Sequence, residues 1–158
     1  MITTDTHVFF YGGVFSNWYP AKFNYQVGGL QFENTEQAFM IEKARFFCDK
    51  DVMAQILQTP DPREVKALGR KIKNYDDKAW SCVRYGMMVY VNYLKFSQNE
   101  DLAAELKAVG NRTLVEASPY DKIWGIGLGL GDPEIFTPEL WNGQNLLGKA
   151  LGEVRSML

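Results

Sequence analysis

Residues 34–47 read NTEQAFMIEKARFF and contain a clear signal for a helix start. Asn34 and Gln37 stand in capping-box spacing, in which a polar residue before the helix and a Gln or Glu three positions later satisfy free backbone N–H groups. Apolar residues follow at positions 38, 39, 41 and 44. The stretch therefore predicts a helix over residues 35–47.

Shorter elements are predicted on both sides of this helix. The sequence indicates a strand at residues 8–11, a hairpin at residues 24–32 around Gly28-Gly29, and a strand at residues 113–116. Short helices are predicted over residues 51–57, 62–68 and 101–108. A long helix is predicted to begin at a cap formed by Asp76 or Asp77 and to end at about Phe96. A last helix is predicted to start near Asn142. In the long helix, Val83, Met87, Tyr90 and Leu94 form the expected buried face.

Length and composition favour one globular domain. The 158 residues, 46% of them apolar and 23% charged, suit a single helix-rich α+β domain over residues 1–158 with short strands, without repeats or a linker. A net charge of −2 excludes proteins that hold nucleic acid through a broad basic face. The N-terminus lacks a secretion signal and no apolar run is long enough for a membrane span, so we expect no membrane partner and a cytoplasmic location.

Residue types exclude several common catalysts. His7 is the only histidine and is expected in a flexible terminus, which argues against Ser-His-Asp and Cys-His sites. Cys48 and Cys82 lack CxxC spacing, so neither a zinc site nor a disulfide framework is predicted. The chain has no GxxxxGK[ST] or GxGxxG motif. Carboxylates, lysines and aromatic residues remain as candidates, and we predict no metal and no cofactor.

Glu36 and Lys43 are the first candidate pair. They are seven residues apart on the predicted helix, so they project from the same face about 10 Å apart along the axis. One pocket can receive both side chains. The alternative is structural: Glu36 complements the helix dipole and Lys43 is a solvated surface residue. Spacing alone does not decide between the two interpretations.

Trp80 is the second candidate, one turn into the long helix. A tryptophan in this position is either part of the core or a stacking surface at the edge of a pocket. Both interpretations stay open from the sequence.

Asp121 is the third candidate, because it precedes a loop with alternating glycines. These glycines stand at positions 125, 127, 129 and 131 and let the backbone approach a ligand closely, as a phosphate cradle requires. The helix start expected at Asn142 can add free N–H groups. The alternatives are an ordinary turn carboxylate and ordinary turn glycines.

The order of the short motifs is similar to that of the NADAR (YbiA-like) family. The resemblance covers nearly the whole chain and is carried by FSNW at 15–18, TEQAF at 35–39 with Lys43-Ala44, LGR at 68–70, Trp80, KF at 95–96, DKIWGIG at 121–127 and NLLGK at 145–149. One departure is that Gln37-Ala38 follows the glutamate, where members often have an aromatic residue or histidine.

The resemblance implies an N-glycosidase that acts on phosphorylated ribose compounds. The substrates implied are early riboflavin-biosynthesis intermediates in some members and ADP-ribosylated guanine, in a nucleotide or a nucleic-acid base, in others. By the same resemblance Glu36, Lys43 and Asp121 are the predicted catalytic residues. The predicted substrate-binding residues are Asn17, Trp80, Trp124, Gly125, Gly127 and Asn145.

The chemistry of the reaction agrees with these residue types. Cleavage develops positive charge at the anomeric carbon and negative charge on the leaving nitrogen, so a carboxylate and a proton donor both lower the barrier. Lys43 can instead attack the anomeric carbon and form an imine, provided that apolar neighbours lower its pKa. A module that binds ADP-ribose or a nucleotide without cleaving it is the alternative function. The sequence leaves the physiological substrate and the oligomeric state open.

Overall fold

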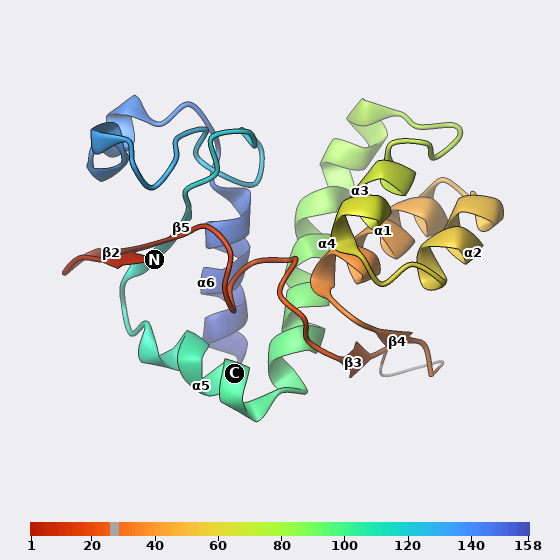
Figure 1. Ribbon diagram of the computed structural model, residues 1–158, viewed down its shortest axis with the longest axis horizontal. Coiled ribbons are helices and arrows are strands. Elements are labelled where there is room, and N and C mark those ends of the chain that lie inside the picture. Colours follow the sequence, from red (N-terminus) through yellow and green to blue (C-terminus); the bar gives the residue numbers. More distant parts are fainter. Residues whose placement is uncertain (26–28) are drawn as a thin grey trace. The chain divides into compact units, whose positions relative to one another are not determined.

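The computed structural model describes residues 1–25 and 29–158 and confirms the α+β class (Figure 1). Contacts divide the chain into two compact units: a first unit of Met1–Ser16 with Glu100–Leu158, and a second unit of Asn17–Asn99. Helices predominate, and the strands have two to four residues each. Whether the two units act as the single domain of residues 1–158 stays a prediction.

The first unit combines a small sheet with two helices. Its elements are β1 (Ile2–Thr3), β2 (His7–Phe10), α5 (Glu100–Ala108), β5 (Thr113–Glu116), the 3-10 turns η1 (Pro133–Phe136) and η2 (Pro138–Leu140), and α6 (Leu146–Met157). The sheet order is β1-β2-β5, with β1 antiparallel and β5 parallel to β2, and α6 packs on β5.

The N-terminus of the first unit is ordered, and our expectation of a flexible segment around His7 is wrong. His7 pairs with Thr113 in the parallel ladder, and its ring stacks 5.6 Å from that of Phe9. Phe9 is 1% exposed and belongs to the core of this unit. Backbone pairing and this apolar anchor therefore hold the segment in place.

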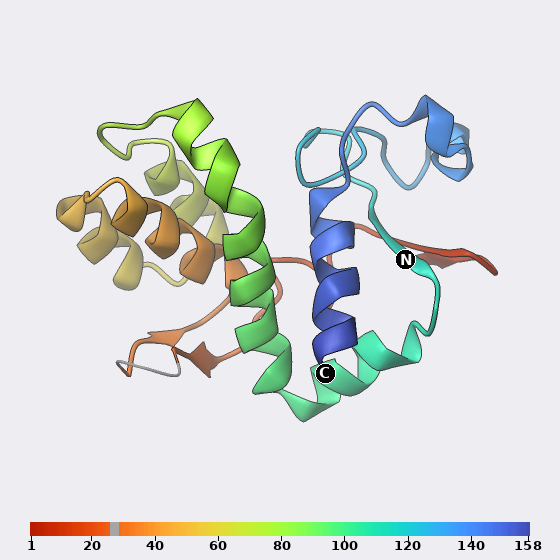
Figure 2. The same cartoon turned by 180° about the vertical axis from the view of Figure 1, so that it is seen from behind.

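The second unit is mostly helical. Its elements are β3 (Phe23–Asn24), β4 (Gln31–Phe32), α1 (Thr35–Phe46), α2 (Lys50–Leu57), α3 (Pro62–Gly69) and α4 (Asp77–Ser97). Helix α1 packs against α2, α3 and α4, as both views of the ribbon show (Figure 1 and Figure 2). The strands of the predicted hairpin pair Phe23 with Phe32, whereas residues 26–28, which include Gly28 of the predicted middle, lie outside the described residues.

The start of α1 confirms the capping prediction. The Oδ1 atom of Asn34 accepts from Gln37 N at 2.9 Å, and Gln37 Oε1 accepts from Glu33 N at 2.9 Å. Gln37 Nε2 also donates to the carbonyl oxygens of Ile56 and Thr59, both at 3.0 Å. The capping glutamine thus also ties α1 to the end of α2.

The long helix α4 begins as predicted, but of its predicted buried stripe only Leu94 is fully buried. Asp76 caps it by accepting from Ala79 N at 2.8 Å, whereas Tyr90 of the predicted buried stripe is 40% exposed. The observed buried face contains Trp80, Met88, Val89, Val91, Asn92, Leu94, Lys95 and Phe96. A count of apolar residues could not find this face, because two of its members are polar.

The last helix begins four residues later than predicted, at Leu146 instead of near Asn142. The backbone N–H groups of Asn142, Gln144 and Asn145 donate instead to carbonyls of residues 122–126, at 2.9, 2.9 and 3.1 Å. Asn145 also adopts a left-handed φ of 52°, which a helix interior does not permit. Among the described residues, no helix is long and apolar enough to cross a membrane.

The glutamine that ties α1 to α2 provides a test of this packing. We expect Gln37→Ala to lower the free energy of unfolding by about 3 kcal/mol, because it removes three buried or part-buried hydrogen bonds, to the carbonyls of Ile56 and Thr59 and to the backbone N–H of Glu33. Gln55→Ala on the exposed side of α2 is the control and should cost under about 0.5 kcal/mol. Urea unfolding curves measure both values, and equal losses would contradict the assigned role of Gln37.

Candidate functional site

Glu36 lies in the first turn of α1 within a buried polar cluster. It is 6% exposed, and its backbone N–H donates to the carbonyl of Asn17 at 2.9 Å. Asn17, itself 8% exposed, donates through Nδ2 to Met88 Sδ at 3.3 Å and accepts at Oδ1 from Asn92 Nδ2 at 3.4 Å. The structure therefore brings two of the predicted site residues, Asn17 and Glu36, together.

Asn92 is a member of this cluster that the sequence analysis missed. Its Nδ2 also donates to the carbonyl of Met88 at 3.1 Å, while its buried Oδ1 accepts no hydrogen bond from the residues described. A buried acceptor without a donor costs roughly 1–3 kcal/mol. The only sequence signal was an amide in a helix otherwise rich in apolar residues.

Lys43 is held two turns further along α1. Its Nζ donates to the carbonyl of Gly69 at 3.0 Å and lies 4.4 Å from the centre of the Tyr75 ring. Burial lowers the pKa of Lys43, the Glu36 carboxylate opposes that shift, and the positive charge of Arg70 adds to it. A lowered pKa increases the fraction of neutral amine, which is the form able to attack carbon.

Tyr75 and Asp77 lie beside Lys43, and neither was predicted as a site residue. The hydroxyl of Tyr75 donates to Asp77 Oδ1 at 2.7 Å, while 46% of the residue is exposed. Burial, followed by the hydrogen bond and charge of Asp77, raises the pKa of Tyr75. The phenol therefore stays neutral at physiological pH and presents an uncharged ring.

Trp80 is packed inside an aromatic cluster. It is 4% exposed, and its ring lies 5.4, 5.8 and 6.3 Å from the rings of Phe39, Phe46 and Phe47. Tyr75 joins this cluster through Phe47, at 5.4 Å. The surroundings of Trp80 fit the core interpretation, and its contact with a substrate stays a prediction.

Asp121 and the glycines are neighbours in the first unit. Asp121 Oδ1 accepts from the N–H groups of Ile123 and Trp124 at 2.9 and 2.8 Å, which is the geometry of a turn carboxylate. A Cβ atom at Gly125 would lie 2.9 Å from the carbonyl of Asp121, and Gly127 has a φ of +72°. Both glycines are thus required by the loop itself, whether or not they also contact a ligand.

Asn145 connects β5 to the start of α6. It is 3% exposed; Oδ1 accepts from Glu116 N at 3.0 Å and Nδ2 donates to the carbonyl of Leu114 at 2.9 Å. The neighbouring Trp124 is half-buried, and its carbonyl accepts from Leu147 N at 3.1 Å. These bonds give Asn145 a structural role, so its role in substrate binding stays a prediction.

The predicted site residues are divided between the units. Asn17, Glu36, Lys43 and Trp80 belong to the second unit. Asp121, Trp124, Gly125, Gly127 and Asn145 belong to the first. Within the part of the chain that the structure describes, no group of three or more His, Cys, Asp and Glu residues is arranged to hold a metal ion.

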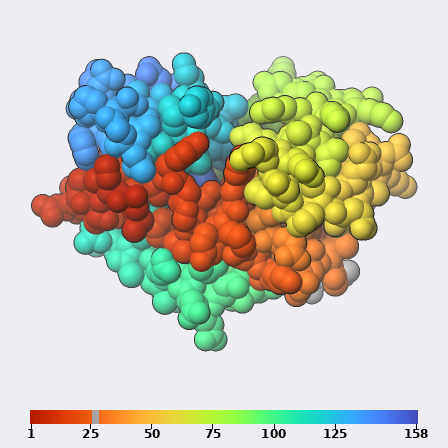
Figure 3. Space-filling view, in the orientation of Figure 1, coloured from red at the N-terminus to blue at the C-terminus, as the bar shows by residue number. Residues whose placement is uncertain are grey.

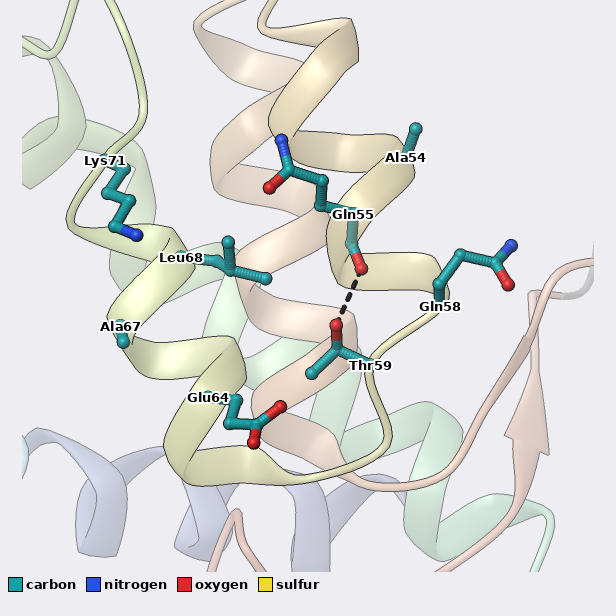
Figure 4. A pocket seen from close by; sticks show the side chains of 8 residues that line it. All are labelled: Ala54, Gln55, Gln58, Thr59, Glu64, Ala67, Leu68 and Lys71. Carbon is teal, nitrogen blue, oxygen red and sulfur yellow. Dashed lines mark hydrogen bonds between the residues drawn. The ribbon is translucent and has the colours of Figure 1, made fainter.

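An open depression of about 650 Å³ lies elsewhere in the second unit, between α2 and α3. Figure 4 shows its lining, which is Ala54, Gln55, Gln58, Thr59, Glu64, Ala67, Leu68 and Lys71. Helix α3, yellow in Figure 3, forms part of the visible surface there. The depression contains none of the predicted site residues, although its lining includes one acid, Glu64, and one amine, Lys71.

Lys95 is a second amine with a displaced pKa. It is 0% exposed on the buried face of α4, with Nζ 5.6 Å from the ring centre of Tyr19 and 4.9 Å from that of Phe96. Burial lowers the pKa of Lys95 to about 7.

Comparisons with known proteins show which family the chain resembles in sequence and in fold. The model of the NADAR domain family matches residues 9–158. N-glycosidase R617 of Acanthamoeba polyphaga mimivirus is 38% identical over 163 residues, covering 96% of each chain. N-glycosidase YbiA of Escherichia coli is 30% identical over 162 residues, covering 99% of this chain and 91% of YbiA. The NMR structure of E. coli YbiA superposes with a TM-score of 0.77 at 27% identity, covering 99% of this chain and 86% of that one.

One longer relative is named for riboflavin biosynthesis and not as an N-glycosidase. The riboflavin biosynthesis protein VVA0006 of Vibrio vulnificus is 30% identical over 146 residues, which are 92% of this chain and 35% of VVA0006.

The buried amine of Lys95 predicts a pH dependence of stability. Its folded pKa of about 7 lies below the unfolded value of 10.5, so the unfolded state binds more protons between these values and stability rises with pH there. From pH 7 to pH 9 the free energy of unfolding of the wild type should gain roughly 2 kcal/mol relative to Lys95→Met, which lacks the group. Urea unfolding at both pH values measures this, and parallel pH profiles for the two proteins would contradict it.

Proposed function

Because the chain belongs to the NADAR family, we propose that it is an N-glycosidase that hydrolyses the N-glycosidic bond of phosphorylated ribose compounds. The observation that carries the proposal is the Glu36–Lys43 pair on α1. The carboxylate is buried in the first turn, and the pKa of the amine is lowered by burial. An acid group and an amine with a lowered pKa on one helix face suit this bond cleavage.

The proposed mechanism proceeds through an imine. The ribose ring opens as the bond between the anomeric carbon and the ring oxygen breaks, and that oxygen takes a proton while the carbon forms an iminium with the leaving nitrogen. Neutral Lys43 adds to this carbon through Nζ. The bond to the leaving nitrogen then breaks, and that nitrogen departs with a proton. Water adds to the resulting lysine imine, which releases the sugar phosphate and regenerates the amine.

The charged residues have assigned roles in this proposal. Glu36 accepts the proton that Lys43 loses, in keeping with the electrostatic interaction between the two groups. Arg70 lies close enough to lower the pKa of Lys43, so it adds a positive charge suited to a phosphate. Asp121 is proposed as the proton donor to the leaving nitrogen. No metal or cofactor takes part, because carboxylates and an amine suffice for each step.

Two substrate classes fit the proposal. One is a phosphoribosylamino-pyrimidine, in keeping with the name of VVA0006, and the other is ADP-ribosylated guanine. A cytoplasmic location suits both. The test is to incubate the protein separately with each compound and to measure released base and sugar phosphate by mass spectrometry. Release from either supports the proposal, whereas binding without release from either would make the chain a nucleotide-binding module.

Exchange of the lysine separates its amine chemistry from its charge. We expect Lys43→Arg to lower kcat by roughly 10³-fold or more, because a guanidinium stays protonated and forms no imine, while KM changes little. The matched control is Lys50→Arg on the exposed start of α2, which should keep wild-type turnover. Steady-state kinetics measure both, and near-normal turnover of Lys43→Arg would limit Lys43 to contacting phosphate.

The residue chemistry also predicts independence from metal ions. We expect turnover to be unchanged after treatment with EDTA, because the proposed steps use only Glu36, Lys43 and Asp121. The same release assay measures it. Loss of turnover in EDTA that one divalent ion restores would contradict the proposed mechanism.

A further inference from the structure

We infer that Tyr75 is the stacking surface for an aromatic leaving base, and that the site therefore selects planar aromatic bases over non-aromatic leaving groups. The inference rests on the proposed function and deepens it. It concerns a residue of the loop between α3 and α4, outside the set that the sequence motifs indicated.

Exposure identifies Tyr75 within the aromatic cluster. A base can stack only on a ring that a ligand can reach, and Trp80 is 4% exposed. The members of the cluster that offer surface are Phe46, 38% exposed, and Tyr75, 46% exposed. Tyr75 is the one beside Lys43, whose Nζ lies 4.4 Å from its ring centre.

The reaction geometry brings a base to this ring. A nucleophile must come within about 3–3.5 Å of the carbon it attacks, and the base is bonded directly to that carbon. Aromatic rings stack with centres about 4.5–7 Å apart. With 4.4 Å between Nζ and the centre of the Tyr75 ring, a base bonded to the carbon that Lys43 attacks can reach stacking distance of this ring.

The ring is also held in place before a ligand binds. Its hydroxyl donates to Asp77 Oδ1 at 2.7 Å, and its ring contacts Phe47 at 5.4 Å with an interplanar angle of 61°. Asn74, directly before it, adopts a left-handed φ of 57°, which sets the direction of the chain at this point. An aromatic surface fixed at its hydroxyl and its ring loses little freedom on binding.

The test measures binding and turnover separately. Calorimetric titration with guanosine 5′-monophosphate and, as the ligand without a base, ribose 5-phosphate is carried out on the wild type, Tyr75→Phe, Tyr75→Leu and the control Phe46→Leu. Tyr75→Leu should weaken binding of the nucleotide roughly 10-fold and leave ribose 5-phosphate unchanged. Phe46→Leu should bind both ligands like the wild type, and Tyr75→Phe, which keeps the ring but loses the bond to Asp77, should lose less nucleotide affinity than Tyr75→Leu.

Several results would overturn the inference. The first is that the wild type does not bind the nucleotide. The second is that Tyr75→Leu loses affinity equally for both ligands or loses none. The third is that Phe46→Leu loses as much nucleotide affinity as Tyr75→Leu. Turnover reports on the proposed function independently. If the wild type binds the nucleotide through Tyr75 but cleaves no N-glycoside, only the proposed enzyme activity is contradicted. If the wild type cleaves the substrate and Tyr75→Leu has an unchanged kcat/KM, only the stacking role of Tyr75 is contradicted.

Discussion

The hydrogen bonds at the start of α1 are the constraint on which the second unit depends. Gln37 is 2% exposed and bonds at once to the backbone before its own helix and to the end of α2. A buried amide side chain tolerates little displacement, because each hydrogen bond that it loses leaves a buried polar group that water cannot reach. The rotation of α1 about its axis is thereby fixed, and with it the directions of Glu36 and Lys43.

The buried face of α4 shows a second departure from an apolar core. Asn92 keeps an acceptor without a donor among the residues described, and Lys95 is buried with a pKa lowered to about 7. Both features cost folding free energy that an apolar residue would not. The Asn92 amide supports Asn17, whose carbonyl in turn receives the N–H of Glu36. The buried Asn92 therefore lowers the stability of the second unit, and its hydrogen bond to Asn17 helps to position the first turn of α1.

Local signals in the sequence were sufficient for most elements. The cap at Asn34, the cap at Asp76 and the strand at residues 113–116 depend on neighbours in the chain, and the structure confirms all three. The buried face of α4 and the start of α6 depend on contacts with distant residues. The buried face of α4 is hard to recognise in the sequence because it includes polar residues such as Asn92. Helix α6 starts later than predicted because the backbone of Asn142 bonds to the loop at residues 122–126.

The site shows the same limit. Motif resemblance named Glu36 and Lys43, but Tyr75 is brought to Lys43 by the packing of a loop, which no local pattern records. The central claim is that Lys43 forms the bond to the sugar. Borohydride added during turnover, followed by peptide mass mapping, tests it directly: the account predicts one reduced sugar-phosphate adduct on Lys43. Turnover without an adduct, or an adduct on the other low-pKa amine, Lys95, would contradict it.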